Sequence, residues 1–183
     1  SSSSGRRCAA RRGRAPAPGP TDAGADCVRL RLLAVGTRMP GWVVDGFAEY
    51  EKRIAGPLKF SLQEIAPSRR AASGDTARGI EEEGQRLLDA TRTGEFVVAL
   101  DERGREWSTR ELADWLALRM QQGQDVALLV GGADGLSAAV LQRAEQRWSL
   151  SKLTLPHPLV RVLVAEQLYR AHSLLHNHPY HRA

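Results

Sequence analysis

The fold of this chain is decided by residues 96–132, FVVALDERGREWSTRELADWLALRMQQGQDVALLVGG. The stretch begins and ends on strand-length apolar runs, residues 96–100 and 126–130. Between them, Ser108 and Glu111 have the spacing of a capping box, which predicts that a helix begins there. Strands that are apolar at every position are buried on both faces, and a helix joining two of them is typical of a parallel sheet. The stretch therefore predicts a parallel α/β sheet covered by helices on both sides.

The same alternation of strand and helix continues in both directions from this stretch. The expected strands are residues 28–35, 58–65, 96–100, 126–130 and 150–155. The expected helices are residues 42–54, about 75–91, 108–122, 137 to about 147, and 159–176. Five strands that are each followed by a helix predict one α/β domain over residues 27–183, and a chain of 183 residues is long enough to bury one core.

Residues 1–26 form a separate segment that is rich in Ser, Arg, Ala, Pro and Gly. Without hydrophobic periodicity, the segment cannot bury enough apolar surface to offset the entropy of ordering, so we expect it to be disordered. An Arg- and Ser-rich, acid-poor opening is also typical of an organelle transit peptide. A translation start placed too far upstream is the preferred interpretation, because the ordered pattern begins abruptly at Val28 and the chain has no initiator Met. A cytoplasmic location is then expected.

The formal charge of +5 is spread unevenly along the chain. Residues 1–26 hold five arginines and two aspartates, whereas the remaining segment holds 21 basic and 19 acidic residues, a net charge of only +2. A nucleic acid would therefore bind through a local basic patch and not through overall charge.

The only cysteines, Cys8 and Cys27, lie before the first expected strand. They allow neither a disulfide framework nor a Cys-based metal site, and no metal is expected. From the first expected strand onward the chain has no thiol nucleophile, which excludes Cys-dependent covalent catalysis. No apolar run approaches the roughly 20 residues that span a bilayer, so we expect a soluble protein without a membrane partner.

Three loops leave the carboxyl ends of expected strands, which is where parallel sheets bind ligands. They follow Leu100, Val130 and Leu155. The second loop, Gly131 to Gly135, contains glycines that let a backbone approach a ligand, although a single glycine-rich loop is also an ordinary tight turn. The pattern G-x-G-x-x-G is absent, which argues against a Rossmann-type dinucleotide site.

Residues 149–183 hold all five histidines of the chain. The ionised residues of this segment are Lys152, Arg161, Arg170 and Arg182, against the single acid Glu166. Groups that titrate near neutral pH beside fixed positive charge suit proton chemistry on an anionic polymer.

Five motifs together resemble the RlmH family, whose members are SPOUT-class methyltransferases acting on N3 of a pseudouridine in large-subunit (23S) ribosomal RNA. The motifs are LLAVGTRMPGW (32–42), VVALDERGREWS (97–108), LLVGGADGLS (128–137), RWSLSKLTLPHPLVRVLVAEQLYRA (147–171) and NHPYHR (177–182). The resemblance covers Val28 to Arg182. One departure is Ala133-Asp134, where the family pattern has Pro-Glu.

The resemblance implies a parallel-sheet SPOUT fold with a C-terminal trefoil knot, formed when the last strand and helix thread through a loop. It also implies the cofactor S-adenosyl-L-methionine (SAM), held among the knot loops. The implied cofactor-binding residues are Leu100, Gly131, Gly132, Ser151, Lys152, Leu153, Thr154, Leu155 and Pro156. The leucines among them would offer apolar walls, although packing in the core would explain each of them equally well.

The resemblance further implies catalytic roles for His157, Tyr180, His181 and Arg182. Pseudouridine N3 must lose a proton before it attacks a methyl group, and no covalent adduct is needed, which agrees with the missing thiol. His157 would be held stiffly between two prolines beside the methyl group. The tail residues would supply stacking, proton handling and phosphate contact, and the identity of the general base stays open. Two further histidines, at positions 172 and 176 of the last helix, are interpreted as structural.

The RlmH family is homodimeric, and its partner is the large-subunit rRNA of the ribosome. The last helix, with Val160, Leu163, Val164 and Leu168, is apolar enough to bury two surfaces. We therefore expect it at a dimer interface, with each tail completing the site of the partner. Burial against its own sheet could use the same side chains.

Two other functions compete with this interpretation. One is a non-catalytic ribosome-binding or assembly factor that kept the fold, against which the intact ligand loops argue. The other is a SPOUT methyltransferase that acts on tRNA or on a ribose hydroxyl.

Overall fold

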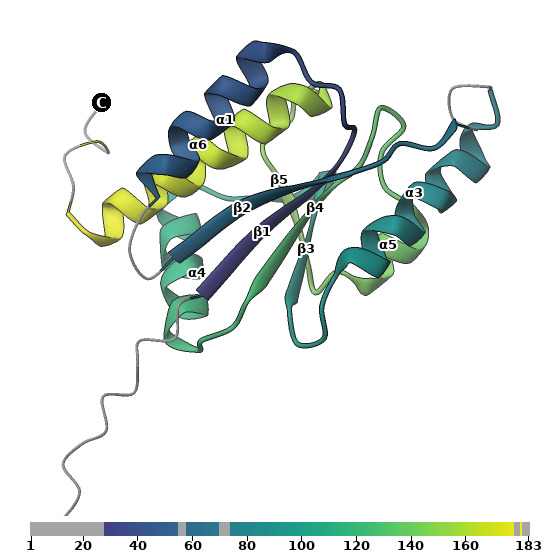
Figure 1. Ribbon diagram of the computed structural model, residues 1–183. Coiled ribbons are helices and arrows are strands. Elements are labelled where there is room, and N and C mark those ends of the chain that lie inside the picture. Colours follow the sequence, from purple (N-terminus) through teal and green to yellow (C-terminus); the bar gives the residue numbers. More distant parts are fainter. Residues whose placement is uncertain (1–27, 55–57, 70–73, 178–179, 181–183) are drawn as a thin grey trace, which may run out of the picture.

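A five-stranded sheet forms the centre of the molecule (Figure 1). The computed structural model describes residues 28–54, 58–69, 74–177 and 180. The strands are β1 (Val28–Val35), β2 (Leu58–Ile65), β3 (Phe96–Glu106), β4 (Val126–Val130) and β5 (Gln146–Ser149), in the order β2-β1-β4-β3-β5. The helices are α1 (Gly41–Arg53), α3 (Thr76–Ala90), α4 (Thr109–Gln121), α5 (Ala138–Arg143) and α6 (His157–Leu175). Every neighbouring pair of strands is parallel, so the predicted α/β class is confirmed.

Helices cover the sheet on both faces, as the apolar strands predicted. On one face α6 packs between α1 and α4, and on the other α3 packs with α5 (Figure 1). Adjacent residues of a strand point to opposite faces, so the fully buried Leu32 and Leu33 of β1 belong to two separate clusters. Leu32 packs in the cluster that contains Leu168 of α6, and Leu33 in the cluster that contains Leu87 of α3.

The predicted capping box opens α4. The backbone N–H of Glu111 donates to Ser108 Oγ at 3.2 Å, and the backbone N–H of Ser108 donates to Glu111 Oε2 at 2.8 Å. Ser137 caps α5 in the expected way, because its Oγ accepts from the N–H of Val140 at 3.3 Å. Both helices therefore begin where the side-chain pattern predicts.

The prediction of the last strand was wrong. Helix α5 ends at Arg143 and not near Arg147, β5 is Gln146–Ser149, and residues 150–156 form a loop. The strand was missed because Gln146 and Arg147 interrupt any apolar run, while the following segment alternates polar and apolar residues as a half-buried strand does.

Strand β3 is longer than predicted, since it continues past Leu100 to Glu106. Strand β5 pairs with it in two stretches, and Trp148 is opposite both Leu100 and Arg105. Between these stretches Gly104 passes so close to β5 that a Cβ there would lie 2.7 Å from the carbonyl carbon of Arg147. The polar sequence after Leu100 concealed this extension.

Two observations apply to the described part of the chain alone. No helix in it is long and apolar enough to cross a membrane. No group of three or more His, Cys, Asp or Glu side chains in it is arranged to hold a metal ion. The prediction that residues 1–26 are disordered falls outside the described residues.

Candidate active site at the carboxyl edge of the sheet

The loops after β4 and β5 leave the carboxyl edge of the sheet, whereas the predicted loop after Leu100 is a continuation of strand β3. Leu100 lies at the point where β3 and β5 stop pairing regularly, and Gly131 follows β4 directly. Thr154, in the loop after β5, donates from its hydroxyl to Glu102 Oε2 at 3.5 Å. The predicted cofactor segments thus meet at one edge.

The loop after β4 closes tightly on itself. Gly135 donates its N–H to the carbonyl of Gly132 at 3.2 Å, and it has a φ of +88°, which favours glycine. A Cβ on Gly131 would lie 2.3 Å from the carbonyl oxygen of Gly135. The loop keeps this shape only because position 131 has no side chain.

The need for glycine at position 132 comes from neighbouring protein atoms and not from a ligand, as its place in a predicted ligand loop had indicated. A Cβ there would lie 2.9 Å from Glu83 Oε2 and 3.3 Å from Val35 Cγ1. The missing side chain leaves room for the protein's own carboxylate, whereas the expectation was close approach of a ligand to the backbone.

The loop between β5 and α6 is held by Ser149 and Ser151. Ser149 Oγ donates to the carbonyl of Ser151 at 3.0 Å, and Ser151 Oγ accepts from the N–H of Leu153 at 3.0 Å. Leu153 is 73 % exposed, so packing in the core does not explain it. Leu100 and Leu155 are half-buried, and Leu100 packs against the core. The exposed members of the predicted set are Lys152, Leu153, Thr154 and Pro156.

His157 is the first residue of α6 and lies at this same edge. Pro156 precedes the helix in extended backbone and Pro158 occupies its first turn, which suits proline because those N–H groups have no partner inside the helix. Burial and then the charge of Arg161 lower the pKa of His157, while Glu83 opposes the shift. The imidazole is therefore neutral at pH 7 and able to accept a proton.

Arg161 anchors α6 to the end of β1, a role that the sequence did not reveal. Its Nη2 donates to the carbonyl oxygens of Val35 at 3.0 Å and Gly36 at 2.7 Å, and its Nη1 donates to Glu64 at 2.7 Å. Only 1 % of the Arg161 side chain is exposed. Its position one helical turn after His157 was visible in the sequence, but its partners were not.

Glu83 of α3 is a second residue that sequence reasoning missed. It is 6 % exposed, and its Oε1 accepts from the backbone N–H of Ser68 at 2.8 Å. It also faces Gly132 and acts electrostatically on His157. No local pattern identifies such a residue, because Ser68, Gly132 and His157 are all distant from it in the sequence.

Tyr180 lies at the other end of α6 from His157. Its ring centroid is 4.6 Å from that of Tyr169, and Arg170 stacks over it at 5.1 Å. Residues 157 and 169 are twelve positions apart, which is about 18 Å along an α-helix. Within one chain, the structure does not bring Tyr180 to His157.

The phenol of Tyr180 is held in its protonated form. It donates to Glu166 Oε1 at 3.4 Å. Burial and the neighbouring Tyr50 raise the pKa of Tyr180 to about 12. The other tail residues predicted to be catalytic, His181 and Arg182, lie outside the described residues.

Helix α6 uses its apolar residues in two ways. Val164 and Leu168 are completely buried against the chain's own core, whereas Val160 and Leu163 are half-buried. The burial of Val164 and Leu168 agrees with the alternative prediction, in which the helix packs against the chain's own sheet. The second pair retains exposed apolar surface.

Comparison with known proteins gives the class to which this fold belongs. A family model described as "Predicted SPOUT methyltransferase" matches residues 28–181, so the chain belongs to the SPOUT methyltransferase family. Within this class, it is similar to curated proteins named "Ribosomal RNA large subunit methyltransferase H" from Methylococcus capsulatus and Chromohalobacter salexigens. They are 54 % and 56 % identical over 155 residues, which is 85 % of this chain and 100 % of each relative. The resemblance to the RlmH family is confirmed.

A solved structure agrees with the fold. The probable methyltransferase from Bordetella pertussis Tohama I superimposes with a TM-score of 0.52 at 17 % sequence identity. The match covers 80 % of this chain and 95 % of the other. At this identity the similarity concerns the fold alone.

Proposed function

We propose that the protein is a SAM-dependent methyltransferase that methylates N3 of a pseudouridine in large-subunit (23S) rRNA, acting on assembled ribosomes in the cytoplasm. The observation that carries the proposal is the identity of more than half of all residues with ribosomal RNA large subunit methyltransferases H over their full length.

The residues at the carboxyl edge fit SAM. The closed loop from Gly131 follows β4 at this edge, and Leu153 offers an apolar side chain that the protein does not cover. Leu100, Gly131, Gly132 and the backbone of residues 151–156 would hold the cofactor. When bound, SAM supplies an electrophilic methyl group.

The chain's own residues contribute to the reaction by orienting the RNA nitrogen toward the methyl group and by accepting its proton. In-line orientation of the RNA nitrogen can supply roughly 7–11 kcal/mol of the lowering of the barrier. A base of suitable pKa adds about 10²- to 10⁴-fold. His157 is neutral, lies at the cofactor edge and has its backbone fixed by prolines, so it is suited to accept the N3 proton directly or through water.

The tail is proposed to act on the site of a second protomer in a homodimer. Tyr180 is separated from His157 by most of the length of α6, so a catalytic contribution of Tyr180, His181 and Arg182 is best supplied in trans. The half-buried Val160 and Leu163 support an interface on α6.

The activity is tested with purified protein, labelled SAM and ribosomes from a strain that lacks the gene. The expected product is 3-methylpseudouridine in large-subunit rRNA, identified by nucleoside mass spectrometry. Label only on ribose oxygen or on tRNA would contradict the substrate. SAM or ribosome binding without any transfer would favour an assembly factor.

Action in trans is tested by mixing two inactive variants, His157→Ala and a chain truncated after Asn177. In a mixed dimer, the truncated protomer keeps an intact pocket and its partner keeps an intact tail, so one of the two sites should recover activity. SAM binding by the truncated chain is the control for an intact pocket. A mixture that exchanges subunits and stays inactive would show that the tail does not act in trans.

A further inference from the structure

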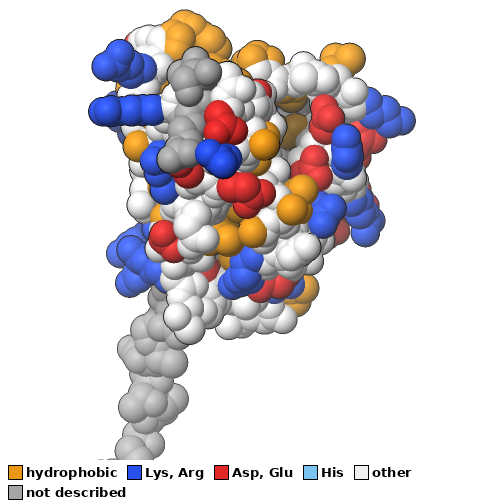
Figure 2. All heavy atoms as spheres, turned by 90° about the vertical axis from the view of Figure 1, so that its right-hand side faces the viewer, with side chains coloured by type: hydrophobic (Ala, Val, Ile, Leu, Met, Phe, Trp, Pro, Cys, Tyr) orange, Lys and Arg blue, Asp and Glu red, His pale blue; other side chains and the backbone are white. Residues whose placement is uncertain are grey.

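Two of the four fixed cations of the C-terminal segment form ion pairs with carboxylates of the protein. Arg161 pairs with Glu64 and Arg170 pairs with Glu166. The face on the side of α3 and α5 shows Lys and Arg interspersed with Asp and Glu (Figure 2). Neither feature offers an RNA chain a run of free positive charge.

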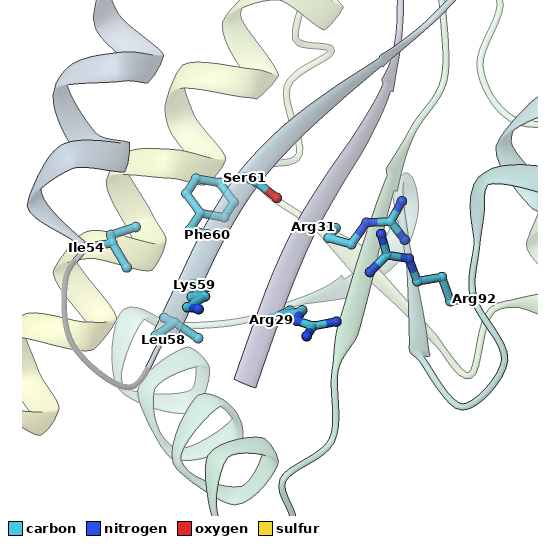
Figure 3. A pocket seen from close by; sticks show the side chains of 8 residues that line it. All are labelled: Arg29, Arg31, Ile54, Leu58, Lys59, Phe60, Ser61 and Arg92. Atoms are coloured by element: carbon cyan, nitrogen blue, oxygen red, sulfur yellow. The ribbon is translucent and has the colours of Figure 1, made fainter. Parts of the chain in front are cut away.

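Cationic side chains without an ion-pair partner among the described residues lie instead at the amino-terminal edge of the sheet. This edge is opposite the carboxyl edge that holds the candidate active site. An open hollow of about 680 Å³ lies over the amino-terminal halves of β1 and β2 (Figure 3). Arg29, Lys59 and Arg92 line it, together with the hydroxyl of Ser61. We call these four residues and the space between them the amino-edge hollow.

The register of the sheet places these side chains together. Arg29 is opposite Lys59 and Arg31 is opposite Ser61 in the parallel pairing of β1 with β2. These four strand residues therefore point to the same face of the sheet. Figure 1 shows α3 and α5 over the other end of this face. The amino-terminal half of the strand pair is thus left open.

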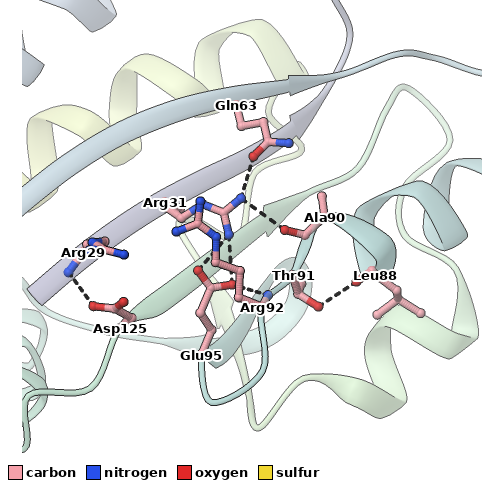
Figure 4. Close-up of polar contacts among 9 residues, drawn as sticks. All are labelled: Arg29, Arg31, Gln63, Leu88, Ala90, Thr91, Arg92, Glu95 and Asp125. Atoms are coloured by element: carbon pink, nitrogen blue, oxygen red, sulfur yellow. Dashed lines mark hydrogen bonds and ion pairs between the residues drawn. The ribbon is translucent and has the colours of Figure 1, made fainter.

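A buried ion pair forms the base of the hollow (Figure 4). Arg31 Nη1 donates to both oxygens of Glu95 at 2.7 and 3.0 Å, and Arg31 Nη2 donates to Gln63 Oε1 at 2.5 Å. The backbone N–H of Arg92 donates to Glu95 Oε2 at 2.7 Å, which fixes the loop that carries the Arg92 side chain. The guanidinium group of Arg92 therefore extends from a loop whose backbone is held by the ion pair.

The charges of the hollow are unbalanced. Glu95 neutralises Arg31, and Asp125 accepts from the backbone of Arg29 at 2.8 Å. Across the described residues, no carboxylate forms an ion pair with the exposed side chains of Arg29, Lys59 or Arg92. Like charges placed directly opposite on neighbouring strands repel each other. A polyanion in the hollow would relieve this repulsion.

We propose that the amino-edge hollow binds the phosphodiester backbone of RNA. Along β1, Arg29 lies about 20 Å from Val35 and the cofactor edge, so the contact is with a part of the RNA remote from the methylated base. Such contacts position a nucleic acid without reading its sequence. The inference rests on the proposed rRNA substrate and adds a second contact to it.

Protection of the sheet edge is the competing explanation for Lys59, since β2 is an edge strand and lysine on an edge discourages pairing with other chains. It does not extend to Arg29, which lies on the inner strand β1, or to Arg92, which lies in a loop.

The test replaces Arg29, Lys59 and Arg92 together by Gln in the full chain. The matched control, Arg78→Gln with Arg110→Gln and Arg143→Gln, removes the same charge from exposed positions on α3, α4 and α5. Affinity is measured for protein-free 23S rRNA and for large ribosomal subunits at several salt concentrations. Loss of three phosphate contacts should weaken binding at least about tenfold at 150 mM salt and lower the salt slope by about two to three. SAM affinity should not change.

The outcomes separate the two proposals. Equal RNA affinities for the hollow variant and the control would overturn the hollow as an RNA site. Loss of affinity for whole subunits but not for protein-free rRNA would also overturn it, in favour of a ribosomal protein contact. If the wild-type chain binds rRNA through the hollow yet transfers no methyl group, the hollow stands and the proposed enzymatic function fails.

Discussion

Gly131 is the residue on which the shape of the loop after β4, the proposed cofactor loop, depends most directly. A Cβ at this position would lie 2.3 Å from a backbone oxygen, which no side-chain rotation can relieve. Gly131→Ala should therefore open the loop, at a cost of about 1–3 kcal/mol, and lower SAM affinity about tenfold or more in calorimetry. Gly41→Ala is the control, because nothing lies within 4 Å of its Cβ position. Unchanged SAM affinity in Gly131→Ala would place the cofactor elsewhere.

Two histidines make the stability of the protein sensitive to acid. Burial and the neighbouring His176 lower the pKa of His172, and burial and Arg161 lower that of His157. The unfolded chain then binds protons more readily than the folded one. The contribution of the two histidines to the free energy of unfolding is fully present above about pH 6.5. It is lost as the pH falls below that value.

His172→Phe should reduce this acid loss, because it removes one of the two groups at similar size. The His172 Nε2 atom is buried without a hydrogen-bond partner, so that nitrogen gives up no bond. Urea unfolding at pH 7.5 and 5.5 measures the difference. An equal decrease in the variant and the wild type would show that His172 does not contribute.

At this scale, the sequence predicted contacts that are local and missed those that are not. The Ser108–Glu111 capping box spans three positions and was visible as a pattern. The hydrogen bond from Arg161 to Val35 joins residues 126 positions apart, and that to Glu64 joins residues 97 apart. Only the assembled sheet brings such partners together.

Helix α6 is attached to the sheet through Arg161. In Arg161→Met, the carbonyls of Val35 and Gly36 lose their partner, and each buried unsatisfied group costs about 1–3 kcal/mol. We expect the free energy of unfolding to fall by roughly 3 kcal/mol, measured by urea denaturation. Arg53→Met, in an exposed pair with Glu49, should leave stability nearly unchanged. A similar loss in both variants would contradict the anchoring role.

Four of the five strands follow from apolar runs or from alternation of apolar and polar residues, and the fifth does not. β1, β2 and β4 have the predicted bounds and β3 begins where predicted, because apolar residues occupy most of the positions that face the core. β5 is four residues long and contains Gln146 and Arg147, so its pairing with β3 outweighs its composition. Of the three strand ends that the predicted ligand loops follow, only that of β4 at Val130 was placed correctly, because β3 continues to Glu106 and β5 ends at Ser149. The contacts of Gly132 and Glu83 could not be predicted.

At the scale of the whole molecule, residues 1–26 should be dispensable. They show no apolar periodicity, and the family match begins at residue 28. A chain that starts at Cys27 keeps Val28, which is 2 % exposed in the core. We expect its unfolding free energy to stay within about 0.5 kcal/mol of the full chain and its methyl transfer to be unchanged. A loss above about 1–2 kcal/mol in denaturation would show that the segment packs on the domain.

The order of the strands governs how the chain is completed during translation. β4 lies between β1 and β3 although it is made after both, and β5 pairs only with β3. α6, which lies between α1 and α4 on one face of the sheet, is made after all five strands. The core residues that it covers, among them Leu32, therefore stay exposed while the preceding elements are synthesised. We expect this face of the sheet to acquire its native packing last.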